Sequence, residues 1–192
     1  MDAFLAANDY KNIVHFDHRE TGLREGIERV KYDYPDFFFA KNKSFISKIK
    51  SKLFKVLRER HIAGTFSQHG HKVAKFYKGS NWISLNWRSA EKMLAFIASN
   101  PWYVNMYRRS LCGDEVFFHT ALRLAGVEDF LLRENQSSHD FRYIDWNRGP
   151  DYPRTLDESD LTSIKSTQDL FARKFPADLE KAVFLKLIGS VD

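Results

Sequence analysis

The chain has 192 residues, which fits a single domain, and its 43% hydrophobic and 29% charged residues are those of an ordinary globular protein. This balance excludes a disordered tail, a collagen and a small disulfide-stapled fold. The formal net charge of +5 is mild and only weakly indicates an anionic partner. The single cysteine, Cys112, excludes an intramolecular disulfide, and no run of ~18 apolar residues predicts a membrane span. Without a recognisable secretory signal, the sequence predicts a cytoplasmic chain.

The first 60 residues are predicted to hold one short strand and one helix. β-Branched and aromatic residues at 12–17 indicate the strand. The charged segment 19–35 is predicted to be a loop, because Gly22 and Gly26 interrupt it. A helix is expected to begin after the N-cap Ser44, since apolar residues then recur at helical spacing: Phe45, Ile49, Leu53, Val56 and Leu57.

In the middle of the chain, the sequence predicts strands and helices in alternation. Apolar and polar residues alternate over 82–87, which indicates a half-buried strand. Ser89 is expected to cap a helix that ends at Pro101, and another helix is expected to open at Gly113. Strand patterns return at 130–132 and 141–146.

The C-terminal part and the pattern as a whole predict an α/β fold. Thr155 and Glu158 have capping-box spacing ahead of a short helix, and Pro176 is expected to begin a last amphipathic helix. Strands and helices therefore alternate along the chain. About four strands are counted, which is few for a complete doubly wound sheet. No repeat or linker divides the sequence, so residues 1–192 are predicted to form one domain.

The helix that follows Ser44 has a basic face. Eight Lys or Arg residues and a single acid, Glu59, lie between positions 41 and 60. Such a face is usually solvated, but it would also suit nucleic acid or an anionic membrane surface. Phe45, Phe54 and Leu57 are assigned to the core stripe, which leaves no aromatic residues among the cations, so no nucleic-acid partner is expected. Peripheral attachment to a membrane stays open, at ~1 kcal/mol per cation near the surface.

Two carboxylates, Asp114 and Glu115, lie where a glycine loop enters a helix. The N-terminus of a helix stabilises an ionised carboxylate. An ionised and accessible carboxylate is what a general base needs to take a proton from a sugar hydroxyl. On the residues alone, the plainer alternative stays open: Asp114 caps the helix and Glu115 adds charge to its first turn.

Two cations, Arg154 and Lys174, flank a short helical segment near the C-terminus. If they converge, they would stabilise a diphosphate leaving group without a metal ion. The alternative is two unrelated surface cations, and the residues alone leave both interpretations open.

Other candidates are weaker. The common nucleotide-binding and nucleophile motifs are absent from the sequence. Glu115 and His119 are four residues apart, which can serve a metal but more often gives a simple side-chain contact. Cys112 is interpreted as a buried bystander rather than a nucleophile.

Four short motifs occur in a fixed order: K-G-S-N-W-I-S-L at 78–85, G-D-E at 113–115 followed by Thr120, R-Y-I-D-W at 142–146, and F-A-R-K-F at 171–175. Together they resemble the core-2/I-branching β-1,6-N-acetylglucosaminyltransferase family, which is glycosyltransferase family 14 and includes the peptide O-xylosyltransferases. The resemblance covers nearly the whole chain and is most secure over 76–175.

The resemblance implies a GT-A-like fold and an inverting glycosyl transfer that needs no metal or other cofactor. The donor would be a UDP-sugar that carries GlcNAc or xylose, and the acceptor would be a hydroxyl group of a glycan or another molecule. By this resemblance Glu115 matches the catalytic base, Lys174 matches the lysine that contacts the UDP phosphates, and Arg154 lies near the phosphate-binding arginine. Tyr143 and Trp146 match a region on the acceptor side.

The same resemblance leaves some positions less defined. Asp114 is placed with the substrate-binding residues, beside the expected base. Residues 17–29 match a loop that faces the acceptor, and no individual role is assigned there. Gly113 replaces the proline that is usual before Asp-Glu in the family.

The family's first β-α units, which carry part of the nucleotide-binding fold, have no counterpart in this sequence. We therefore expect the chain to correspond to the C-terminal portion of such an enzyme. The alternative is a truncated, non-catalytic remnant, or a half-enzyme that needs a separate N-terminal part.

Overall fold

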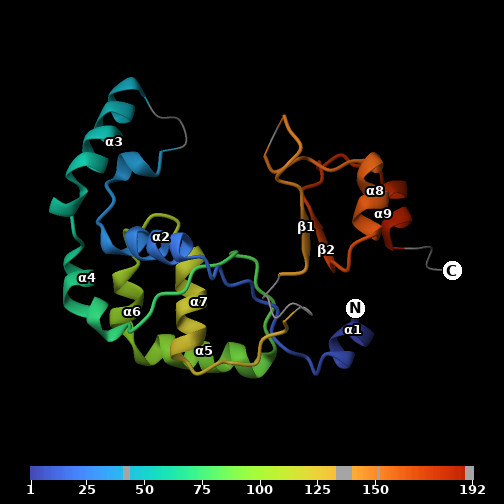
Figure 1. Ribbon diagram of the computed structural model, residues 1–192, viewed down its shortest axis with the longest axis horizontal. Coiled ribbons are helices and arrows are strands. Elements are labelled where there is room, and N and C mark those ends of the chain that lie inside the picture. The colour runs from blue at the N-terminus through green and yellow to red at the C-terminus, as the bar shows by residue number, and fades with distance from the viewer. Residues whose placement is uncertain (41–43, 133–139, 151, 189–192) are drawn as a thin grey trace. The chain divides into compact units, whose positions relative to one another are not determined.

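A computed structural model describes residues 1–40, 44–132, 140–150 and 152–188. These residues form two compact units (Figure 1). The first unit, Leu5–Asp140, is called the helical unit; the second, Met1–Phe4 with Phe141–Asp192, is called the sheet unit. The first helix, α1 (Asp2–Ala7), contains the boundary between them.

The helical unit is built from six further α-helices among the described residues: α2 (Glu20–Lys31), α3 (Phe45–Leu57), α4 (Gly64–His69), α5 (Trp87–Ser99), α6 (Pro101–Met106) and α7 (Asp114–Leu124). Helix α5 packs against α6 and α7, and α4 packs against α2 and α6 (Figure 1). Their main core includes Val14, Met106, Val116 and Leu122, all nearly inaccessible to solvent. A smaller cluster of Tyr32, Tyr34 and Phe54 lies under α3.

Helix α2 replaces the loop that the sequence predicted over 19–35. That prediction was wrong because it took both glycines as helix breakers, whereas they are places of close approach. A side chain at Gly22 would overlap the Asp17 carboxylate, and one at Gly26 would press on Lys78 and Val116. The glycines therefore let α2 lie close to its neighbours.

Helix α3 begins where the sequence predicted, with the Ser44 hydroxyl accepting a hydrogen bond from the Ser47 amide. The predicted core stripe is wrong. Phe54 is buried, with 6% of its surface exposed, but Phe45 is 77% exposed and Val56 is 80% exposed. The helix therefore turns much of its apolar surface to solvent.

Helix α5 begins earlier than expected. Its N-cap is Asn86, whose side chain accepts from the Ser89 amide, so Ser89 is a buried first-turn residue rather than the cap. The helix ends at Ser99, and Pro101 begins α6. A proline suits that position, because the first turn of a helix needs no amide hydrogen there. Helix α7 opens directly after Gly113, as predicted.

The segments predicted as strands at 12–17, 82–87 and 130–132 pair only through isolated bridges: Asn12 with Phe130, Ile13 with Ser84, and Phe16 with Gly79. The fully buried Asn12 side chain adds to these backbone bridges. It accepts from the Asn86 amide and donates to the Asp129 carbonyl at 2.7 Å. Single backbone bridges and one buried side chain therefore join the three extended segments, where the sequence pattern predicted strands.

The sheet unit holds two parallel strands, β1 (Arg142–Ile144) and β2 (Phe171–Arg173), paired in register from Arg142 with Phe171 to Ile144 with Arg173. Strand β1 lies inside the predicted 141–146. The short helix α8 (Leu161–Lys165) packs against α9 (Lys181–Ile188).

Two boundaries in the sheet unit differ from the predictions. The capping box is formed by Asp157 and Asp160, two residues after the expected Thr155 and Glu158. Helix α9 starts at Lys181, so Pro176 precedes it by several residues. Helices with a small parallel sheet are compatible with an α/β glycosyltransferase-like domain. Within the described residues, no helix is both long and apolar enough to cross a membrane.

Candidate functional site

The predicted base, Glu115, lies in the first turn of α7 and forms an ion pair with Arg29 of α2. The Arg29 Nη1 atom donates to Glu115 Oε2 at 2.5 Å. The Glu115 side chain is 32% exposed, so solvent reaches it, and its Oε1 atom accepts no hydrogen bond from the residues that the structure describes. Among the described residues, the carboxylate is therefore hydrogen-bonded at Oε2 and not at Oε1.

The motif at 78–85 lies directly against the motif at 113–120. The Gly79 amide donates to the Glu115 carbonyl at 2.9 Å, and the Asn81 side chain donates to the Asp114 carboxylate at 2.9 Å. Further along α7, the Thr120 hydroxyl accepts from the Tyr77 amide. Two motifs that are about 35 residues apart in the sequence therefore form one local structure, which fixes the N-terminal turns of α7.

Helix α2 supplies a charged face that sequence reasoning missed. Lys78 donates to the Glu25 carboxylate at 2.9 Å, and Arg29 lies one turn further along the helix. The Lys78 ammonium lowers the pKa of Glu25. The i, i+4 spacing of Glu25 and Arg29 was the signal that could have revealed this face.

Asp17, on the segment before α2, also carries a lowered pKa. Its carboxylate accepts two hydrogen bonds from the Arg19 guanidinium, which is the main cause of a pKa of about 2. The Lys78 carbonyl accepts from the Asp17 amide at 2.8 Å. The stretch expected to face an acceptor is thus anchored to the motif at 78–85.

Glu115 and His119, four residues apart on α7, have different surroundings. His119 is fully buried, and burial lowers its pKa to about 4, so its ring is neutral at pH 7. The Glu115 side chain instead turns to Arg29. Across the described ranges, no three His, Cys, Asp or Glu side chains gather as a metal site would need.

The second group of predicted residues lies at the carboxyl end of the sheet in the sheet unit. Lys174 follows β2 directly, and its carbonyl accepts from the Leu156 amide at 2.7 Å. The Arg154 amide donates to the carbonyl of Asp145, the residue after β1, at 2.8 Å. Segment 154–156 therefore bridges the ends of both strands and brings Arg154 and Lys174 to one edge. Ligands of open parallel sheets commonly bind at this edge.

The Arg154 side chain is engaged in an ion-pair network around Asp160. The Asp160 carboxylate is fully buried and accepts from Arg154 Nε at 3.2 Å and from Arg148 Nη2 at 2.7 Å. Arg154 also donates to Asp157, and Arg148 to Asp145. The pKa of Asp145 is lowered, mainly by the hydrogen bond from the Asn147 amide. Arg148 is a further cation at this edge that sequence reasoning missed.

Lys174 differs from the two arginines. Its side chain is partly exposed, and it forms no ion pair with any residue in the described part of the chain. An ammonium without a carboxylate partner is available to an anion. The backbones of Arg154 and Lys174 lie at the same edge, but Arg154 already has carboxylate partners with which a phosphate would have to compete.

The aromatic residues expected on the acceptor side lie on and beside β1. Tyr143 is in the strand, and its hydroxyl lies 3.4 Å from Arg148 Nη2. Trp146 follows the strand and is 58% exposed. An exposed indole presents a flat apolar face of the kind that packs on sugar rings.

The predicted residues thus form two local groups. Asp114 and Glu115 belong to the helical unit, whereas Tyr143, Trp146, Arg154 and Lys174 belong to the sheet unit. Cys112, just before α7, is exposed, so the interpretation as a buried residue was wrong.

Comparison with known proteins gives one match. The model of the Core-2/I-Branching enzyme family matches residues 30–169, more than half of the chain. None of the curated proteins matches, and none of the solved structures does. The matched range includes Glu115 and Arg154 and ends before Lys174. The chain therefore belongs to the Core-2/I-Branching enzyme family, which implies glycosyltransferase activity.

Proposed function

We propose that this protein transfers GlcNAc or xylose from a UDP-sugar to a hydroxyl group of a glycan or another acceptor, with inversion at the anomeric carbon and without a metal ion. The observation that carries the proposal is the Glu115 carboxylate. It lies at a helix N-terminus on a partly exposed side chain, is hydrogen-bonded at one oxygen by Arg29, and has no hydrogen bond from the described residues at the other.

Glu115 is the general base in this proposal. Its free Oε1 accepts the proton of the acceptor hydroxyl while the hydroxyl oxygen bonds to the anomeric carbon. The bond from that carbon to the diphosphate oxygen breaks on the opposite face, and UDP leaves with the electron pair. Arg29 is a positioning residue, because it fixes the carboxylate without contacting the reacting atoms.

Lys174 and Arg154 stabilise the leaving diphosphate. Their place at the carboxyl end of β1 and β2 supports this role, as does the lack of a carboxylate partner for Lys174 among the described residues. Positive charge at this point lowers the barrier as negative charge grows on the departing oxygen. Trp146 and Tyr143 offer aromatic surface to the acceptor sugar, and Asp114, held by Asn81, lies beside the base.

Calorimetric titration of UDP without added metal tests donor binding. We expect UDP to bind the full chain and Lys174→Ala to weaken binding about tenfold to a hundredfold, since a charge-assisted hydrogen bond is lost. The matched control is Lys165→Ala, an exposed lysine at the end of α8. No heat with millimolar UDP would contradict the proposal and favour a half-enzyme that needs a separate part.

Release of UDP from a UDP-sugar in the presence of acceptor tests the base. We expect Glu115→Gln to lower kcat by about a hundredfold or more while UDP affinity stays unchanged. Glu91→Gln, an exposed acid on α5, is the matched control. Unchanged turnover in Glu115→Gln would exclude Glu115 as the base.

A further inference from the structure

Helix α3 displays a continuous apolar stripe to solvent. Five of its residues are at least half exposed: Phe45 (77%), Ile46 (64%), Ile49 (51%), Leu53 (57%) and Val56 (80%). At 100° per residue these positions fall within an arc of roughly 100°. The buried Phe54 lies on the opposite side, where α3 meets the smaller core cluster. The stripe is therefore a second apolar face that packing within the helical unit does not use.

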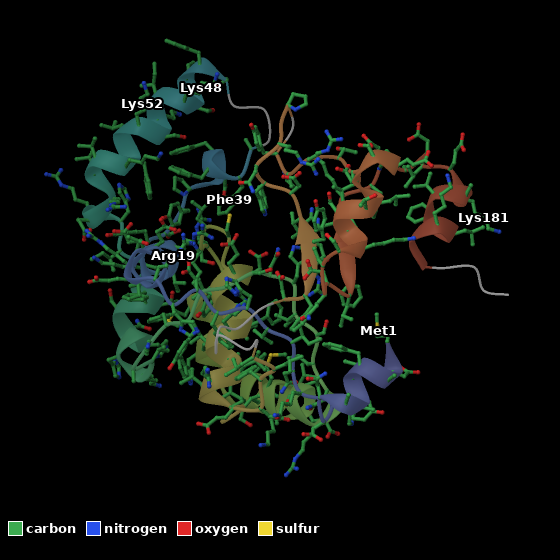
Figure 2. The ribbon with its side chains drawn as sticks, turned by 45° about the vertical axis from the view of Figure 1, so that its right-hand side comes forward. Met1, Arg19, Phe39, Lys48, Lys52 and Lys181 are labelled. Carbon is green, nitrogen blue, oxygen red and sulfur yellow. The ribbon has the colours of Figure 1, made fainter. Side chains whose placement is uncertain are left out.

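Lysines border the stripe. Lys48 and Lys52 follow each other by one turn along one margin, and Lys50 lies beyond the other margin. Figure 2 shows Lys48 and Lys52 on successive turns of α3. All three are exposed, as is Lys55, and none of the four forms an ion pair with another described residue. Arg58, just beyond the helix, is by contrast held by Glu28.

The apolar surface continues beside the helix. A hollow of about 390 Å³ lies along α3, and Leu53 belongs both to the stripe and to its wall. Phe37, Phe54 and Leu57 add apolar surface there, and Lys50 lies at the same hollow. The apolar surface of α3 is thus wider than one row of side chains, and lysines lie along both of its margins.

We propose that α3 binds the surface of a bilayer that contains anionic lipid, with the stripe lying among the acyl chains and the lysines at the headgroups. An amphipathic helix with a basic polar face is the usual structure for such binding. Unpaired lysines on both margins complement negative headgroups, which attract each lysine near the surface without needing a fixed partner for it. None of the residues proposed for transfer belongs to this surface, so its role in the proposal is location rather than transfer.

Vesicle flotation of the full chain tests this proposal. The probes are vesicles of phosphatidylcholine with 30% phosphatidylserine and vesicles of phosphatidylcholine alone. We expect binding to the anionic vesicles that weakens as salt is raised. Lys48→Gln with Lys52→Gln should weaken it about thirtyfold, and Phe45→Gln with Val56→Gln about a hundredfold or more. The controls are Lys92→Gln and Leu94→Gln, exposed positions on α5.

A label gives a second readout. In Cys112→Ser, the substitution Val56→Cys leaves one thiol, on α3, for an environment-sensitive dye. We expect its emission to shift to the blue with anionic vesicles. Failure of the unaltered chain to float at low salt would overturn the proposal, as would equal binding by the lysine variant. A dimer in sedimentation that dissociates in Phe45→Gln with Val56→Gln would overturn it as well, since a second copy would then cover the stripe.

Discussion

At the scale of single residues, the ion pair of Arg29 with Glu115 gives a direct test of how the proposed base is positioned. Arg29→Gln removes the guanidinium that holds Glu115 Oε2. We expect kcat to fall about tenfold while the KM for the donor stays unchanged, because only the orientation of the carboxylate is lost. Steady-state kinetics of sugar transfer measures both constants.

Two further variants separate positioning from general damage. Arg29→Lys should recover part of the activity, since an ammonium still donates to the carboxylate. Arg24→Gln, on the same helix and 81% exposed at its side chain, should behave like the unaltered chain. Turnover of Arg29→Gln within twofold of the unaltered chain would show that Glu115 needs no such support.

Gly79 tests the close contact between the two motifs in the helical unit. A side chain at this position would overlap the His15 carbonyl and the His119 ring. We expect Gly79→Ala to lower the free energy of unfolding by about 3 kcal/mol, since backbone cannot move aside cheaply. Gly64→Ala is the control, because nothing lies within 4 Å of the added carbon. Urea unfolding followed by tryptophan fluorescence measures both; equal stabilities would contradict the contact.

His119 predicts a pH dependence of stability. Its pKa is about 4 in the folded protein and about 6.5 when unfolded. Between these values the unfolded chain binds a proton that the folded chain does not, so stability is complete above pH 6.5 and falls as the pH is lowered toward 4. We expect a loss of about 2 kcal/mol between pH 7 and pH 5, measured by urea unfolding.

A comparison of variants tests whether His119 causes this loss of stability at low pH. His119→Met should remove most of the pH dependence, whereas His71→Gln, at an exposed site, should retain it. Asp17 does not interfere, because its pKa of about 2 places its own loss below pH 3.8. If His119→Met shows the same slope as the unaltered chain, another group causes the loss.

At the scale of elements, periodicity predicted the helices better than it predicted their burial. Helix α3 begins at the predicted Ser44, yet its stripe faces solvent. Spacing reveals that one face is apolar and cannot reveal what covers it. Helix α2 was missed for a different reason. Gly22 and Gly26 lower helix propensity, and contacts of distant residues with α2 override that effect.

Strands were predicted less well than helices. Three of the four predicted strands are extended segments bridged at single residues, and the Asn12 side chain adds hydrogen bonds beside those bridges. Alternation of apolar and polar residues indicates an extended chain, but the pairing depends on partners far along the sequence. Only the strand within 141–146 has a continuous partner, β2.

The ion-pair network in the sheet unit predicts that Asp160 holds the loop after β1 in place. Asp160→Asn removes a buried negative charge and leaves Arg148 and Arg154 without it. We expect β1 and β2 to lose about 1–3 kcal/mol of stability, because hydrogen bonds to a buried carboxylate lose their charge while both arginines stay partly exposed and keep Asp145 and Asp157 as partners. Hydrogen exchange of the strand amides measures this. Glu158→Gln, an exposed neighbour, should change little; equal effects would contradict the network.

At the scale of the whole molecule, the order of four motifs identified the family, which the match over residues 30–169 confirms. The motifs contain most of the predicted site residues, although Arg154 lies outside all four. They did not reveal Arg29 or Arg148, because each is engaged through a contact between separate segments: Arg29 with Glu115, and Arg148 with Asp160. The chemical roles that the motifs suggest stay predictions, and the structure adds the charged residues that contact these segments.

Because these residues belong to two units, the proposal predicts which backbone amides exchange more slowly when the donor binds. Lys174 and Arg154 belong to the sheet unit and Glu115 to the helical unit. If the diphosphate binds at the ends of β1 and β2, UDP at ten times its Kd should slow amide exchange about tenfold in both strands. The amides of α7 should exchange unchanged, since the base contacts the acceptor rather than UDP.

Hydrogen exchange followed by mass spectrometry measures this pattern, with uridine as a control ligand that lacks the phosphates. Uridine should give little protection, and Lys174→Ala should reduce the effect of UDP at the same concentration to about twofold or less. Protection confined to α7 and the segment 78–82 would place the diphosphate beside Glu115. In that case Lys78, and not Lys174, would stabilise the negative charge of the leaving diphosphate. The Lys78 ammonium already pairs with Glu25.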